Sequence, residues 1–178
     1  MATMIFETLI AKKKAAIIKK WFDEVVDSYP ADTSKFLKKQ KDPFSNPVGQ
    51  TTLHGLEAIY DELFKGMERE IITAFLDPII RIRAIQNFTP SQATGFTFAL
   101  KKIIDDHLKK EILSKQYTAE FSQLSTRIDE LGLIAFDIYM SCREKIFQIK
   151  ANEARNQTYS AFKRAGLIVE PGDSREGE

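Results

Sequence analysis

The stretch AEFSQLSTRIDELGLIAFDIYMSCREKIFQIKANEARNQTYSAFKRA, residues 119–165, predicts one long helix that ends before Gly166. Gly132 lies inside this stretch, and we expect it to mark the place where a second helix crosses closely. The first part of the stretch carries large apolar residues at helical spacing and is expected to belong to the core. These residues are Ile128, Leu131, Ile134, Ile138, Ile146 and Ile149.

Small residues replace the large ones in the second part of this helix. They follow Phe147 at spacings of four and three residues, which places them on one face. The stripe consists of Phe147, Ala151, Ala154, Thr158, Ala161 and Ala165. A helix of about two heptads without a partner is marginal in water. We therefore predict that the stripe pairs with its copy in a second subunit, parallel or antiparallel. The alternative is that it folds back onto its own domain.

The rest of the chain also predicts helices. Gly and Pro are few, 8 and 6 residues, which favours long helices over a turn-rich sheet protein. The apolar spacing predicts helices over residues 4–28, 33–38, 51–67, 71–76, 78–85 and 91–113. Thr51 or Thr52, Asp77-Pro78 and Ser91 are expected at helix starts. Phe44 and Val48 are expected to anchor the loop that precedes Gly49.

Composition excludes several classes of protein. Hydrophobic residues make up 43% and charged residues 29% of the chain, which excludes general disorder. The net charge of +1 provides no field for nucleic acid. The apolar run Leu131–Phe136 is far shorter than the roughly 20 residues of a membrane span. We find no signal peptide, and the lone Cys142 makes an internal disulfide impossible, so a cytoplasmic location is expected.

No constellation of residues indicates catalysis or a metal site. The sequence has no Gly-rich phosphate loop, no nucleophile elbow and no paired cysteines. A di-iron bundle needs a Glu three residues before each His. Thr51 precedes His54 and Ile104 precedes His107 at this distance. We predict a non-enzyme without metal or cofactor.

Aromatic residues offer a second interpretation. Trp21, Phe22, Phe96 and Phe98 could line an apolar pocket for a small molecule or lipid. Core packing is the simpler expectation for Trp21 and Phe22. Cys142 lies on an apolar stretch and is expected to be a buried, inert thiol.

Several stretches resemble a known family. They are IIKKWF (17–22), SYP (28–30), FLKKQKDPFSNPVG (36–49), REKIF (143–147) and Asn152-Glu153. Over residues 5–165 the chain resembles the N-terminal domain of the RsbRD-type co-antagonists. The block Asp-Pro-Phe-x-Asn-Pro-Val-Gly, residues 42–49, is the most specific part of this resemblance.

The resemblance implies a globin-like helical fold without haem, which dimerises and serves as a sensory module of bacterial stress-response regulators. In a globin the iron-binding His lies on the helix before the last two. Here residues 78–88 offer Arg81, Arg83 and Gln86 but no His. In full-length relatives the last helix leads into a phosphorylatable domain. The sequence extends to Glu178, and we do not expect that switch in this chain.

Together these observations predict an all-α, globin-like, haem-free domain over residues 1–166 and a disordered polar tail over residues 167–178. We expect a sensor or protein-interaction domain whose partners are its own copy and another regulatory protein. Nucleic acid and membrane insertion are not expected. The alternatives are a small-molecule or lipid-binding module, or a scaffold subunit of a larger complex, including one linked to sulfur respiration.

Overall fold

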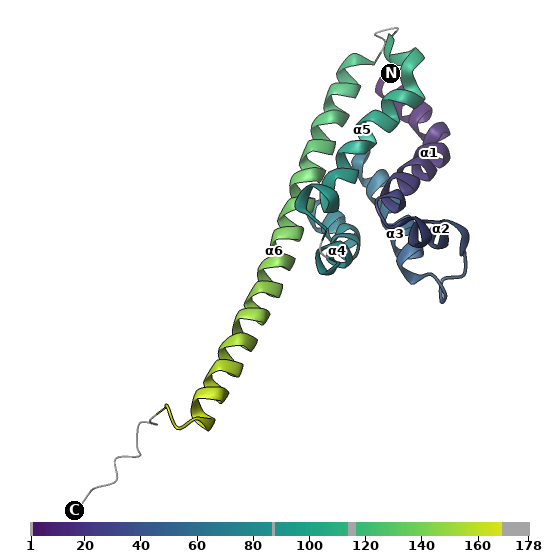
Figure 1. Ribbon diagram of the computed structural model, residues 1–178. Coiled ribbons are helices and arrows are strands. Elements are labelled where there is room, and N and C mark those ends of the chain that lie inside the picture. Colours follow the sequence, from purple (N-terminus) through teal and green to yellow (C-terminus); the bar gives the residue numbers. More distant parts are fainter. Residues whose placement is uncertain (1, 87, 114–116, 169–178) are drawn as a thin grey trace, which may run out of the picture. The chain divides into compact units, whose positions relative to one another are not determined.

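The computed structural model describes residues 2–86, 88–113 and 117–168, and this part of the chain forms six helices (Figure 1). The helices are α1 (Ala2–Asp27), α2 (Ala31–Lys39), α3 (Pro47–Leu63), α4 (Arg69–Ile85), α5 (Pro90–Leu113) and α6 (Thr118–Arg164). No strand occurs within the ranges just given. The predicted all-α fold is thereby confirmed. Its globin-like character stays a prediction.

The chain divides into two compact units, residues 1–142 and 143–178. In the first unit, α1 contacts α2, α3 and α5, and α3 packs along α4 (Figure 1). The second unit holds the C-terminal part of α6. Most of the predicted polar tail, residues 169–178, lies outside the described residues.

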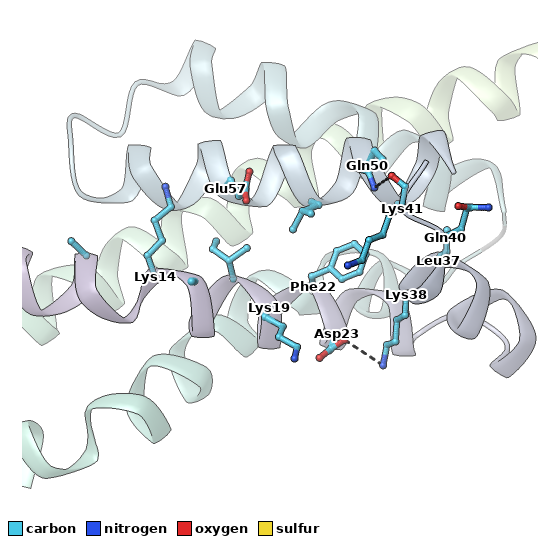
Figure 2. A pocket seen from close by; sticks show the side chains of 15 residues that line it. Lys14, Lys19, Phe22, Asp23, Leu37, Lys38, Gln40, Lys41, Gln50 and Glu57 are labelled. Atoms are coloured by element: carbon cyan, nitrogen blue, oxygen red, sulfur yellow. Dashed lines mark hydrogen bonds and ion pairs between the residues drawn. The ribbon is translucent and has the colours of Figure 1, made fainter. Parts of the chain in front are cut away.

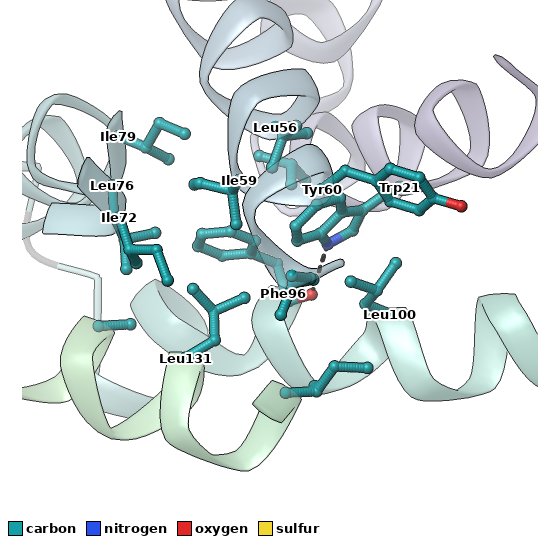
Figure 3. Packing of buried hydrophobic residues seen from close by; sticks show 14 of the residues in the cluster. Trp21, Leu56, Ile59, Tyr60, Ile72, Leu76, Ile79, Phe96, Leu100 and Leu131 are labelled. Carbon is teal, nitrogen blue, oxygen red and sulfur yellow. Dashed lines mark hydrogen bonds between the residues drawn. The ribbon is translucent and has the colours of Figure 1, made fainter. Parts of the chain in front are cut away.

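The core of the first unit is built around Trp21, which is completely buried (Figure 3). Its indole Nε1 donates a hydrogen bond to the carbonyl oxygen of Phe96 at 2.7 Å. The hydroxyl of Tyr60 donates to the carbonyl oxygen of Ile10 at 3.3 Å. Apolar side chains from α3 to α6 fill the space around both rings, among them Leu56, Ile59, Ile72, Leu76, Leu100 and Leu131. The polar ends of both aromatic residues are thus satisfied inside the core.

Arg83 of α4 is also completely buried. Its guanidinium donates to the carbonyl oxygens of Gln92 and Val25, at 2.8 and 2.7 Å, and to the hydroxyl of Ser28. It lies over the rings of Tyr29, Phe88 and Phe96, with centroids 5.0–5.2 Å away. Burial lowers the pKa of Arg83. One side chain thus joins the end of α1 to the beginning of α5.

Three predicted helix starts are wrong. Helix α3 begins at Pro47, not at Thr51 or Thr52, because Asn46 caps it. Helix α5 begins at Pro90, and the Gln92 N–H donates to Oγ1 of Thr89 rather than to Ser91. In each case a proline occupies the first helical position, where its missing N–H costs nothing.

The third wrong start is Asp77-Pro78, because α4 continues through Pro78. Proline inside a helix removes one hydrogen bond and is unfavourable in isolation. Here Ile72 and Leu76 before the proline, and Ile79 and Ile80 after it, are all buried. Packing of this continuous apolar face outweighs the local preference to start a new helix.

Two smaller predictions also need revision. Phe44 does not anchor its loop, because 97% of its side chain is exposed. The helix predicted over residues 51–67 is too long at its C-terminal end, because α3 ends at Leu63. The turn that follows includes Met67 with a φ of 54°.

Gly132 fulfils its prediction. It is buried on α6, and a Cβ at this position would collide with the ring of Phe98 on α5. The absence of a side chain therefore lets the Phe98 ring lie directly on the α6 backbone.

Candidate functional site

A groove with a volume of about 770 Å³ lies between α1, α2 and α3 of the first unit (Figure 2). Its α1 wall repeats at intervals of three and four residues: Ala11, Ala15, Ile18 and Phe22. This spacing places the four side chains on one helix face. Leu53 and Gly49 of α3 form the opposite wall, and Leu37 of α2 contributes at one end.

The groove is hollow because its walls carry small residues. Ala11 and Ala15 are exposed on α1 and leave open the space that longer side chains would fill. Phe22 and Leu53 are half-buried and pack against the core from beneath. The result is an apolar floor open to solvent, of a size typical of small-molecule sites.

Four lysines line the groove, and two of them form ion pairs with aspartate side chains. Lys14 pairs with Asp61 at 2.5 Å. Lys38 pairs with Asp27 at 2.7 Å and with Asp23 at 3.5 Å. The hydrogen bond from Lys38 lowers the pKa of Asp27, and the same bond raises the pKa of Lys38. For the other two, Lys19 and Lys41, no carboxylate of the described residues lies within ion-pair distance.

The segment between α2 and α3 holds one end of the groove in place. The buried amide of Asn46 donates to the carbonyl oxygens of Leu37 and Gln40 at 2.9 and 2.8 Å. Its own oxygen accepts from the Gly49 N–H at 2.9 Å. A Cβ at Gly49 would collide with the Asn46 side chain. The Asn-Pro-Val-Gly sequence is therefore a clamp that joins the end of α2 to the beginning of α3.

The same loop presents an acidic turn. Asp42 accepts hydrogen bonds from the backbone N–H and the hydroxyl of Ser45, and these bonds lower the pKa of Asp42. Between these fixed residues Phe44 is exposed at the tip of the loop.

In the second unit, the six residues of the predicted stripe are all exposed. Phe147 exposes 59% of its side chain, and the Arg143 guanidinium lies 5.0 Å from its ring centre. The Thr158 hydroxyl donates to the carbonyl oxygen of Ala154 at 2.8 Å. The one polar member of the stripe thus has its hydrogen bond within the same helix and needs no outside partner.

Three further exposed apolar residues were missed. Leu133, Phe136 and Met140 lie on the part of α6 that belongs to the first unit, and Leu133 exposes 65% of its side chain. Their spacing is three and four residues, and Phe147 follows Met140 by seven. Extending the stripe toward the N-terminus would have identified them. We predicted this stretch to be core, but only its other face is buried. That burial ends at Cys142, and the predicted core residue Ile149 exposes 65% of its side chain.

The structure separates the four residues of the predicted apolar pocket. Trp21 and Phe96 are buried together in the core, with ring centres 6.3 Å apart. Phe22 lines the groove between α1, α2 and α3. Phe98 lies half-exposed against Gly132. A pocket formed by all four residues stays a prediction. The groove between α1, α2 and α3 was missed because its small residues give no distinctive signal in the sequence.

The family model of the RsbT co-antagonist protein rsbRD N-terminal domain matches residues 15–154. The chain belongs to this family. The resemblance is thus confirmed over the C-terminal half of α1, all of α2 to α5 and most of α6. The Asn46 clamp lies within the matched residues.

A relative of this rsbRD N-terminal domain occurs in Archaeoglobus fulgidus. It is 26% identical over 145 residues, which cover 77% of this chain and 82% of the relative, and it is described as an uncharacterized protein. No solved structure matches the chain.

Both histidines of this rsbRD N-terminal domain contact a neighbouring group. Nδ1 of His107 lies 2.7 Å from the carbonyl oxygen of Ile103, and the His54 ring lies against Phe75. Within the described ranges, no group of three or more His, Cys, Asp or Glu side chains could hold a metal ion. Cys142 is buried, as predicted. None of the helices that the structure describes is long and apolar enough to cross a membrane.

Proposed function

We propose that this chain is a non-catalytic regulatory domain that works as a homodimer paired through α6. Membership of the rsbRD N-terminal family supports a role in stress signalling. Its other partner would be a second regulatory protein in the cytoplasm, and neither nucleic acid nor membrane insertion is required.

The observation that carries this proposal is the exposed stripe from Phe147 to Ala165. Within the second unit every described side chain from residue 147 to 167 is exposed, so the unit itself supplies no core for this helix. A short helix without tertiary packing is marginal in water. A copy of the same small-residue face allows close approach of two helix backbones and supplies the missing packing.

A signal would act through α6, because this helix contributes to the core of the first unit and also carries the exposed stripe. Leu124, Ile128 and Leu131 of α6 belong to the core of the first unit, and the stripe follows on the same helix. A ligand that alters core packing around these residues would shift or rotate α6 slightly. Paired helices convert such a shift into a changed surface for the next protein.

The test is the mass of the protein in solution, measured by sedimentation or light scattering. We expect twice the chain mass of 20.3 kDa at micromolar concentration. Ala154→Glu and Ala161→Glu place charges in the stripe and should each yield monomers. Asn156→Glu adds the same charge on the opposite face of α6 and should leave the dimer intact.

A wild-type protein that remains monomeric at these concentrations would overturn the proposal. So would equal dissociation by Asn156→Glu, because the pairing face would then not be the stripe.

A further inference from the structure

We propose that the groove between α1, α2 and α3 binds an amphipathic anion, namely an alkyl chain that ends in a carboxylate. The groove is lined by residues of the first unit only, and its occupation does not depend on pairing of α6. Only the further idea that this ligand is the regulatory signal rests on the proposed function.

The shape of the groove suits an extended apolar chain. Its α1 wall runs from Ala11 to Phe22, a length of about 17 Å at 1.5 Å per residue. Ala11 and Ala15 leave a trough above the half-buried side chains of Phe22 and Leu53. A slender alkyl chain in this trough would cover apolar surface that now faces water.

Charge is distributed unevenly along the groove. At the α2 end, Lys38 and Lys41 lie near Phe22, with Asp23 as the acidic lining residue (Figure 2). Lys19 lies on the same side, one turn before Asp23. At the other end, Lys14 is paired with Asp61, and Glu57 adds a second carboxylate (Figure 2).

This distribution orients the ligand. The α2 end carries an excess of positive charge, and neither Lys19 nor Lys41 has an ion-pair partner among the described residues. The opposite end carries an excess of negative charge. We therefore place the carboxylate of the ligand beside Lys19 and Lys41, with the alkyl chain directed along Ala15 toward Ala11.

A small ligand fits the groove better than a protein partner does. Fifteen residues line the groove. A standard protein–protein interface uses about 20–30 residues from each partner. The volume of about 770 Å³ lies within the range of small-molecule sites, about 300–1,000 Å³.

The first experiment compares four probes by calorimetric titration of the full chain, each below the concentration at which it forms micelles. Dodecanoate should bind at one molecule per chain. Butyrate keeps the carboxylate but lacks most of the alkyl chain. It should bind at least tenfold more weakly, because each fully buried methylene raises the affinity about fourfold. Dodecanol and dodecyltrimethylammonium keep the chain but lose or invert the charge, and both should bind more weakly than dodecanoate.

The second experiment locates the site with matched variants. Ala15 and Ala16 are neighbouring exposed residues of α1, but only Ala15 lines the groove. Ala15→Trp should weaken dodecanoate binding at least tenfold, and Ala16→Trp should leave it unchanged. Melting curves of both variants would report whether each has folded.

A charge variant keeps the proposal testable if tryptophan disturbs the fold. The double substitution of Lys19 and Lys41 by Ala should weaken dodecanoate binding by roughly three- to tenfold, as expected for exposed charges. The same double substitution at Lys12 and Lys13, which are exposed but do not line the groove, is the control.

Three results would overturn the proposal: equal or tighter binding of dodecyltrimethylammonium, an equal loss with Ala16→Trp, or no saturable binding of dodecanoate. Co-sedimentation with phosphatidylglycerol vesicles but no binding of free dodecanoate would assign the groove to a membrane surface instead. The monomeric variant Ala154→Glu should retain dodecanoate binding. Failure of the dimer and failure of the groove are therefore separate outcomes.

Discussion

At the scale of single residues, Asn46 holds two helices together with one side chain. Asn46→Ala removes the N-cap of α3 and leaves the carbonyl oxygens of Leu37 and Gln40 without their donor. We expect the free energy of unfolding to fall by roughly 2–4 kcal/mol, the sum of a lost cap and buried acceptors left unsatisfied. Urea denaturation measures this loss.

The control for Asn46 lies two residues away. Phe44→Ala removes a larger side chain from the same loop, but this side chain is exposed and should change the unfolding free energy by less than about 0.5 kcal/mol. A loss at Phe44 that equals the loss at Asn46 would mean that the loop is anchored by its aromatic residue, contrary to the structure.

Because of Tyr60, the free energy of unfolding depends on pH in the alkaline range. Burial, together with the neighbouring Asp61 carboxylate, raises the pKa of its phenol. In the unfolded chain the phenol loses its proton near pH 10, whereas the folded chain still retains it there. The unfolded state is therefore favoured as pH rises above about 10, and the stabilisation from a neutral Tyr60 is fully present only below that pH.

Tyr60→Phe should reduce this pH dependence. Above about pH 10 the unfolding free energy of the variant should fall less steeply, by up to about 1.4 kcal/mol per pH unit. Denaturation curves at several pH values between neutrality and pH 12 would measure the slope. Identical slopes for the variant and the wild type would show that Tyr60 ionises equally in both states.

At the scale of elements, the contact between α5 and α6 depends on the pair Gly132 and Phe98. Alanine is favoured over glycine inside a helix by about 0.5–1 kcal/mol. At Gly132 the added methyl group would meet the Phe98 ring. We expect Gly132→Ala to destabilise the protein by about 1–2 kcal/mol, because the ring must move.

A double-mutant cycle isolates this contact. In a Phe98→Ala background the obstacle is gone, so Gly132→Ala should instead stabilise the protein by about 0.5–1 kcal/mol. Additive effects of the two substitutions would indicate that the ring does not lie on the α6 backbone.

The same elements show what the sequence could predict. Long helices with regular apolar spacing were predicted well: α1, α5 and α6 were expected within a few residues of their observed bounds, and Gly132 was placed correctly. Helix starts were predicted poorly. A proline that follows a polar residue fits both the first position of a helix and a break within one, and only packing distinguishes Pro47 from Pro78.

The candidate sites divide in the same way. The stripe from Phe147 to Ala165 was visible because periodicity along one helix is local information. The groove was not visible in the sequence, because it forms only where Ala15 of α1, Leu37 of α2 and Leu53 of α3 come together in the fold. An exposed alanine on one helix looks like ordinary surface until its neighbours across the groove are known.

At the scale of the whole molecule, pairing through α6 would tie the stability of the fold to protein concentration. The core residues and the stripe lie on one helix, so loss of the fold would also remove the pairing surface. When a native dimer unfolds to monomers, its free energy of unfolding rises by about 1.4 kcal/mol per dimer for each tenfold rise in protein concentration at 25 °C. Stability would then be a property of the dimer.

The measurement is the melting temperature over a wide range of protein concentration. For a chain of 178 residues, we expect Tm to rise by roughly 1–3 °C for each tenfold increase, from about 1 to about 100 µM. Ala154→Glu should remove this dependence, because it separates the stripes, and Asn156→Glu should preserve it. A melting temperature independent of concentration in the wild type would mean that each chain folds alone, and that the exposed stripe serves a different protein.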